Sequence, residues 1–347
     1  MSARALAILV VLLVALGGGA LLLQRQEAAE RPANAAVLGQ KVFKDLKAAE
    51  VASIRIADPK SALTLERKED GWALAERGGF PADVAKVRDF VLKAIELKIG
   101  TSEPIGEKDR SRLQVQDPAK GAEGAGTLVE FRSADAKPLA RLIVGKKYFS
   151  REPENAERAP ADGRFVQRPD EPGTVLIVAD PLVQASPRSA DWIDRNVLKI
   201  EKVGTLAVRF PDGSGWKVER SGDNADWKLV GAKPAEKLEI TRANAASYVL
   251  GQLELADVAP TEAKNDLQAS GLDRPTIVEA TTLAGVSYTL RVGKLVGENY
   301  YLSVSSSSGA PRDKLLAEHV LLVPKSRLED TLKPRAEMLA KKEDTKK

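Results

Sequence analysis

Three stretches determine the predicted fold of the first half of the chain: VASIRI at residues 51–56, LTLER at 63–67 and DGWAL at 70–74. The first two alternate apolar and polar residues, which is typical of strands with one buried face. The Asp-Gly pair that opens the third stretch is a hairpin turn signal. Apolar residues then recur at helical spacing from Val84 to Ile99. This order predicts three strands followed by one helix.

The same order returns later in the chain, at an offset of about 150 residues, the length of one ordinary domain. The matched segments are Val51–Ile56 with Val203–Val208, Leu63–Arg67 with Trp216–Arg220, Trp72–Leu74 with Trp227–Leu229, Val91–Leu97 with Val249–Leu255, and Val144–Lys146 with Val292–Lys294. We predict that residues common to both copies form a repeated core: Trp72, Leu74, Leu97, Trp227, Leu229 and Leu255.

These patterns predict an α+β fold, with an N-terminal transmembrane helix followed by two tandem, related domains, each a mostly antiparallel sheet plus a helix. The predicted segments are a cytoplasmic tail at 1–4, a transmembrane helix at 5–23, a tether at 24–48, repeat domains at 49–200 and 201–340, and a basic tail at 341–347. The sequence leaves open whether the domains pack rigidly or swing near Lys199–Lys202.

The segment from Ala5 to Leu23 is an uninterrupted run of apolar residues and glycine. Its length is close to the roughly 20 residues that cross a bilayer as a helix. A cleaved signal peptide is the alternative, but Leu21–Leu23 would then lie beyond the small residues of the cleavage site. We favour an uncleaved anchor, represented by Ala5, Leu13, Ala15, Gly19 and Leu23.

The expected location follows from the short tail before the apolar run. A tail of four residues usually stays in the cytoplasm, so we expect a single-pass protein of the inner (plasma) membrane whose bulk is periplasmic or extracellular. The anchor also contains a small-xxx-small pair, Ala15 and Gly19, which lets helices approach closely. Small residues are common in anchors, so this pair alone does not indicate a helix partner.

The composition leaves few catalytic groups. Among 347 residues there is no cysteine and one histidine, His319, which excludes thiolate chemistry and a site built from several histidines. We expect no cofactor, no metal and no enzymatic activity. A hydrolase that uses His319, or the carboxylates of Glu96 and Glu254 at matched helix ends, is the weaker alternative.

The segment Arg151–Pro172 is rich in proline, arginine and acidic residues, and it interrupts the strands of the first domain. It is either a long mobile hairpin loop or a partner-binding loop, for which Arg151, Arg158 and Arg164 are the candidate contacts. The formal net charge is +4, but acidic and basic residues are interspersed. We find no basic stripe with stacking aromatics, so no nucleic acid is expected as a partner.

The ordered set of motifs resembles the bacterial domain of unknown function 4340 family. The motifs are Gly71-Trp72-Ala73-Leu74 after the hairpin, the helix end at Val249–Leu255, Gly271-Leu272-Asp273-Arg274-Pro275, and the strand end at Val292–Lys294. The first domain departs from the third motif, since Leu113–Pro118 lacks the glycine.

The resemblance implies a single-anchor envelope protein, an accessory subunit beside ABC transporter subunits or a gliding-motility-type complex. It implies no catalytic residues. The partners expected are therefore a membrane protein complex and, through the N-terminal helix, the lipid bilayer. The alternative is a binding module for an envelope glycan or lipid in the cleft between the two domains.

Overall fold

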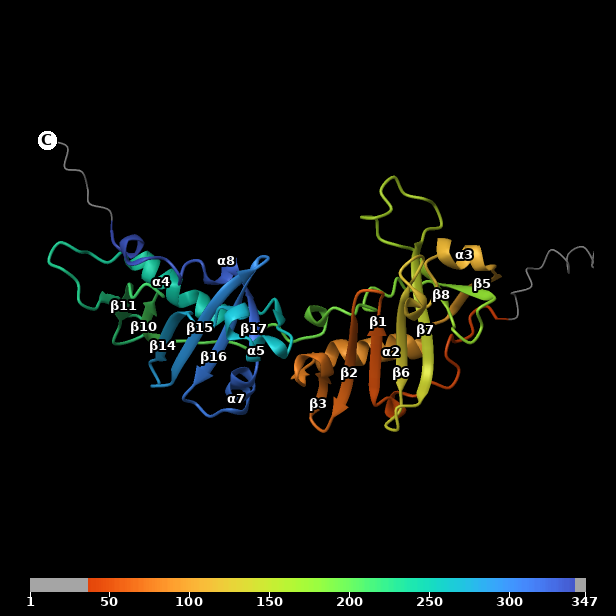
Figure 1. Ribbon diagram of the computed structural model, residues 1–347, viewed down its shortest axis with the longest axis horizontal. Helices are drawn as coiled ribbons and strands as arrows, with labels where there is room; N and C mark the ends of the chain where they lie inside the picture. The colour runs from red at the N-terminus through yellow and green to blue at the C-terminus, as the bar shows by residue number, and fades with distance from the viewer. Residues whose placement is uncertain (1–36, 341–347) are drawn as a thin grey trace, which may run out of the picture.

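The computed structural model describes residues 37–340, which form two antiparallel sheets side by side (Figure 1). The first sheet has nine strands in the described residues: β1 (Ser53–Ala57), β2 (Ala62–Lys68), β3 (Gly71–Leu74), β4 (Phe80–Pro81), β5 (Ile99–Pro104), β6 (Thr127–Arg132), β7 (Pro138–Tyr148), β8 (Gly163–Gln167) and β9 (Thr174–Val178). The second has eight: β10 (Val203–Arg209), β11 (Gly215–Glu219), β12 (Lys228–Leu229), β13 (Asp257–Val258), β14 (Thr276–Thr282), β15 (Ser287–Val296), β16 (Asn299–Ser306) and β17 (Val320–Pro324).

The helices are short. The α-helices of the described residues are α2 (Val84–Glu96), α3 (Glu107–Arg112), α4 (Ile240–Tyr248), α5 (Glu262–Asn265), α6 (Leu267–Ser270), α7 (Pro311–Glu318) and α8 (Lys325–Leu328). Single 3₁₀ turns lie at η1 (Ala48–Glu50), η2 (Ala75–Arg77), η3 (Pro118–Lys120), η4 (Ser189–Asp191), η5 (Val249–Gln252) and η6 (Arg335–Met338).

The first sheet follows from the alternation in its strands. Ile54 and Ile56 of β1 are fully buried and pair with Leu65 and Leu63 of β2. Helix α2 then crosses one face of the sheet, as Figure 1 shows, and leads to the opposite edge strand β5. Asp83 starts α2, because its side chain accepts hydrogen bonds from two backbone N–H groups of the first turn.

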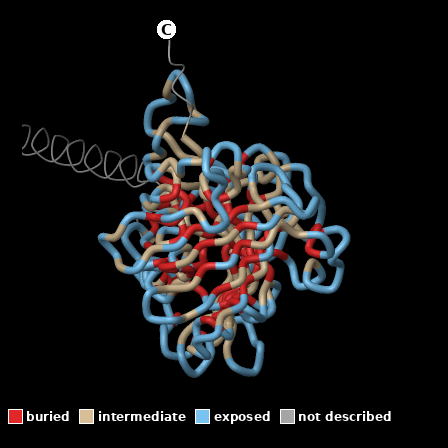
Figure 2. The backbone as a smooth tube through the Cα atoms, turned by 90° about the vertical axis from the view of Figure 1, so that its left-hand side faces the viewer, coloured by how far each residue is buried: buried red, intermediate tan, exposed pale blue. Residues whose placement is uncertain are grey.

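The two sheets share one strand order. The first runs β4-β3-β2-β1-β6-β7-β8-β9-β5 and the second β12-β11-β10-β14-β15-β16-β17-β13, so they correspond position by position from β3 and β12 onward. In the second sheet α4 and η5 take the place of α2. Figure 2 shows the buried residues concentrated in the interior of the molecule, with exposed segments around them.

The connection between the sheets, residues 179–202, is packed between them. Ile193 forms an antiparallel bridge with Ala82, beside β4 of the first sheet. Two residues later the carbonyl of Arg195 accepts a hydrogen bond of 2.8 Å from the N–H of Leu255, next to β13 of the second sheet. Ile200 is also buried, at 1% exposure. One continuous cluster of buried apolar residues includes members of both sheets, so they form one packed body.

These observations correct the predicted fold class. The sheets are antiparallel throughout, and helices are few and short, so the described part is a two-sheet β structure and not an α+β fold with substantial helices. Longer helices do not form because many connections are tight turns between neighbouring strands, and the helices are confined to the longer connections and to the segment after β17. None of the helices within residues 37–340 is long and apolar enough to cross a membrane.

The predicted anchor residues Ala5, Leu13, Ala15, Gly19 and Leu23 lie outside the described residues, as do the tail at 341–347 and most of the predicted tether.

Candidate functional site

The loop between β7 and β8, residues 149–162, projects from the first sheet (Figure 1). Its interior is organised by Lys147, the ammonium of which donates to the backbone carbonyls of Ala156, Glu157 and Ala159 at 3.3, 2.8 and 3.1 Å. The base is closed by Asp162, which accepts hydrogen bonds from the N–H and hydroxyl of Ser150. These bonds lower the pKa of Asp162, so the carboxylate stays ionised to a more acidic pH than an ordinary aspartate does.

The outer surface of this loop is charged and exposed. Arg151 and Arg158 are both exposed, among the acidic residues Glu152, Glu154 and Glu157. An ordered, exposed loop with both signs of charge can recognise a complementary protein surface.

Arg164, the third candidate of this group, lies in β8. Its guanidinium donates to the carbonyl of Pro181 at 2.8 Å and of Gly145 at 3.2 Å. Burial lowers its pKa. Arg164 therefore positions the base of the loop through contacts within the protein.

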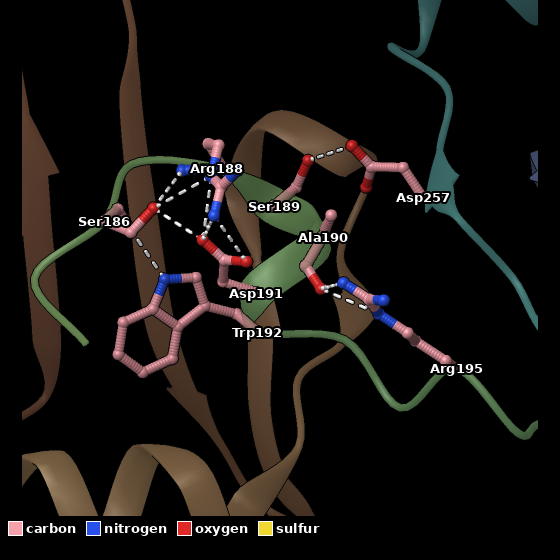
Figure 3. A network of polar contacts seen from close by, with 8 residues as sticks. All are labelled: Ser186, Arg188, Ser189, Ala190, Asp191, Trp192, Arg195 and Asp257. Carbon is pink, nitrogen blue, oxygen red and sulfur yellow. Dashed lines mark hydrogen bonds and ion pairs between the residues drawn. The ribbon is translucent and has the colours of Figure 1, made fainter. Parts of the chain in front are cut away.

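A second candidate lies where the sheets meet, at η4 (Figure 3). The hydroxyl of Ser189 donates to Asp257 of β13 at 2.7 Å, and Arg77 of the first sheet lies 4.0 Å from the same carboxylate. The guanidinium of Arg195 donates twice to the carbonyl of Ala190. Ser189 and Asp257 are far apart in sequence and belong to no motif, so no sequence signal could have paired them.

Beside this network is a cavity of about 310 Å³, lined from the first sheet by Arg77 and Gly78 and from the second by residues that include Thr261, Lys264 and His319. The ring nitrogens of His319 lie 2.8 Å from the carbonyl oxygen of Leu315 and 3.2 Å from that of Gly78. The ring also packs edge-on against Phe80, with centroids 5.2 Å apart. His319 thus joins the two sheets.

The arrangement does not bring the hydrolytic candidates together. Both nitrogens of His319 face backbone carbonyls, and no hydrogen bond to a serine or a carboxylate is present among the described residues. Glu96 is paired with Lys41 at 2.8 Å, and that hydrogen bond lowers its pKa. The carboxylate of Glu254 forms an ion pair with the guanidinium of Arg327 in α8, at 2.7 Å. Within residues 37–340 no group of three or more acidic or histidine side chains could hold a metal ion.

The predicted core residues lie in the cores of the two sheets to different degrees. Leu74, Leu97, Trp227 and Leu255 are buried, at 5% exposure or less. Trp72 and Leu229 are half-buried and pack against the continuous core.

A family model described as a domain of unknown function (DUF4340) matches residues 72–275, more than half of the chain. The chain belongs to the DUF4340 family. The family model matches this DUF4340 protein once. The match begins in β3 and ends immediately before β14, so it spans parts of both sheets. Two separate DUF4340 copies, one for each domain, were predicted and are not found. Comparisons with curated proteins and with solved structures find no match.

Proposed function

We propose that this DUF4340 protein is a non-catalytic accessory subunit of a membrane protein complex, and that it binds its partner through the loop at residues 149–162. The observation that carries the proposal is the ordered projection of this loop, with Lys147 at its centre and Arg151 and Arg158 on its surface. ABC transporter subunits are the partners we expect, on the strength of the family resemblance.

The corresponding strand orders support a further part of this proposal, that the two sheets descend from one duplicated unit. In the second sheet β15 and β16 are joined by the short turn at 297–298. The long loop is thus a feature of the first sheet that the second sheet does without. A difference confined to one copy favours a specific role over a requirement of the fold.

A location at a membrane belongs to the same proposal. The apolar run from Ala5 to Leu23 supports it, although these residues lie outside the described part of the chain. Cell fractionation of the tagged full-length protein tests the location. Recovery in the soluble fraction would contradict it.

The partner is tested by affinity purification of the full-length protein in mild detergent, followed by mass spectrometry. We expect transporter subunits to co-purify with the native chain and to be lost when residues 151–160 are replaced by a short Gly-Ser turn. A matched control replaces the exposed Val183 with alanine, away from the loop. A chain that emerges alone, or a loop variant that keeps the same partners, would contradict the proposal.

The junction cavity favours a second candidate, the binding of an envelope glycan or lipid between the sheets. Its lining includes His319 and combines the basic side chains of Arg77 and Lys264 with the acidic side chain of Glu318. Two results together would support this function: the full-length protein is retained on isolated cell wall or on anionic lipid vesicles, and Lys264→Ala weakens that retention. Absence of retention at low salt would remove it.

A further inference from the structure

A larger cavity, of about 600 Å³, lies in the second sheet domain and shares no lining residue with the loop at residues 149–162 or with the junction cavity. This volume falls in the range of about 300–1,000 Å³ that is typical of ligand sites. Its walls are the end of α4, the turn η5 and the chain just before β10.

The floor of this cavity is fixed. Trp227 is 3% exposed, and the guanidinium of Arg220 lies 4.7 Å from the centre of its ring. Arg220 donates to the carbonyls of Val203 and Asp223 and to the carboxylate of Asp223, at 2.7, 2.6 and 2.9 Å. Because these groups hold the guanidinium, it supports the tryptophan and is not free to bind an anion.

The rim carries an exposed aromatic ring. Tyr248, the last residue of α4, is 67% exposed and lines the cavity. Its hydroxyl accepts a hydrogen bond of 2.7 Å from the side chain of Gln252, which restrains the ring. Tyr248 precedes Val249 and Leu250, and Phe90 precedes a Val-Leu pair at the matching position of the first domain. Phe90 is 3% exposed and packs against Trp192. The second domain therefore presents to solvent an aromatic ring that the first buries.

Polar groups of both kinds surround this ring. The side-chain oxygen of Asn244 accepts from the indole N–H of Trp227 at 2.9 Å, so the amide nitrogen of Asn244 keeps two donors without a partner among the described residues. The side-chain oxygen of Gln252 and the exposed carboxylate of Asp223 supply acceptors. The lining charges balance, with Glu201 and Asp223 opposed by Lys202 and Arg220, so the site does not favour an anion.

We propose that this cavity binds a neutral saccharide, the carbon-bound hydrogens of which stack on Tyr248 while its hydroxyls pair with Asn244, Gln252 and Asp223. A sugar ring has one apolar face and hydroxyls that both donate and accept, which matches an aromatic ring flanked by amides and a carboxylate. Lys202 adjoins the site in a left-handed backbone conformation, with φ of 51°, the kind of uncommon geometry that gathers at binding sites.

The test uses the full-length protein in a detergent without a sugar headgroup, because a glycosidic detergent would compete. Saturation-transfer NMR with chitotetraose and with maltotetraose measures contact between sugar protons and the protein. We expect transfer to at least one sugar, a roughly tenfold weaker affinity in Tyr248→Ala, and a nearly unchanged affinity in Tyr248→Phe, which keeps the ring.

Val183→Ala is the control for the loss of an exposed apolar side chain elsewhere, and it should leave binding unchanged. Two outcomes would overturn the proposal: no transfer to either sugar at millimolar concentration, or equal binding by Tyr248→Ala and the native protein. Circular dichroism of each variant checks that the fold is kept.

Discussion

Asp313 of α7 is a buried carboxylate, with 4% of its surface exposed. Burial alone raises the pKa of an aspartate, but here the pKa is lowered, because hydrogen bonds from Ser308, Ser306 and Arg312 together outweigh burial. Tyr288 of β15 also donates to this carboxylate, at 3.2 Å. The ionised carboxylate therefore fastens α7 to the sheet.

Asp313→Asn should destabilise the protein by about 1–3 kcal/mol at neutral pH, because it removes hydrogen bonds to a charged group. A lowered pKa in the folded state stabilises the fold above the ordinary aspartate pKa, near 3.9, and this contribution disappears as the pH falls through the lower folded value. Urea unfolding measured from neutral pH down to about pH 3 should thus show a shallower acid dependence in the variant.

Asp212→Asn is the matched control, since the Asp212 carboxylate also accepts from a serine but is fully exposed. It should change stability little. An unaltered acid dependence in Asp313→Asn would show that this carboxylate is not held in its ionised form.

At the scale of elements, the side chain of Lys147 holds the interior of the loop at residues 149–162. Lys147→Met removes the three hydrogen bonds from the ammonium to loop carbonyls. We expect limited proteolysis to cut this loop several-fold faster in the variant, while the sheet stays folded. Lys146→Met changes the exposed neighbouring lysine and should leave the rate unchanged. Equal rates in both variants would mean that the loop is held by other contacts.

Strands with strong alternation could be predicted from sequence, and short polar ones could not. The strand predicted at residues 51–56 overlaps β1 (Ser53–Ala57), because its apolar residues face a core. The edge strand β5 has the polar sequence IGTSEP, and β13 is only two residues long. Their pairing depends on neighbours distant in sequence, so local pattern carries no signal of it.

Helix α4 shows that similar sequences in the two domains can adopt different local structures. Val249–Leu255 matches Val91–Leu97 in sequence, yet α4 ends at Tyr248 and Val249–Gln252 forms a 3₁₀ turn. Gly251 disfavours an α-helix there, and its backbone passes close to Ile200 of the connecting segment. The same turn brings Gln252 beside Tyr248, so the saccharide candidate could not be found from the repeat alone.

At the scale of the whole molecule, the continuous core predicts that both sheets unfold together. Trp192 of the connecting segment is 2% exposed and packs edge-on against Phe90. Trp192→Ala should lower the free energy of unfolding by about 3–5 kcal/mol. It should also lower the midpoint temperature of one calorimetric transition that both sheets share. The exposed Val183 replaced by alanine is the control. Two separate transitions, of which only one responds, would show that the sheets are independent.

The strand order also has a kinetic consequence. Strand β5 occupies the far edge of the first sheet, but its partner β9 begins about 70 residues after β5 ends. While the chain is being synthesised, β1 and β5 therefore keep unpaired edges until β6–β9 have been made and pair between them. Such non-local closure is slow, and an open edge can pair with another chain. Nascent copies of this protein are thus most vulnerable to aggregation in the interval between the emergence of β5 and that of β9.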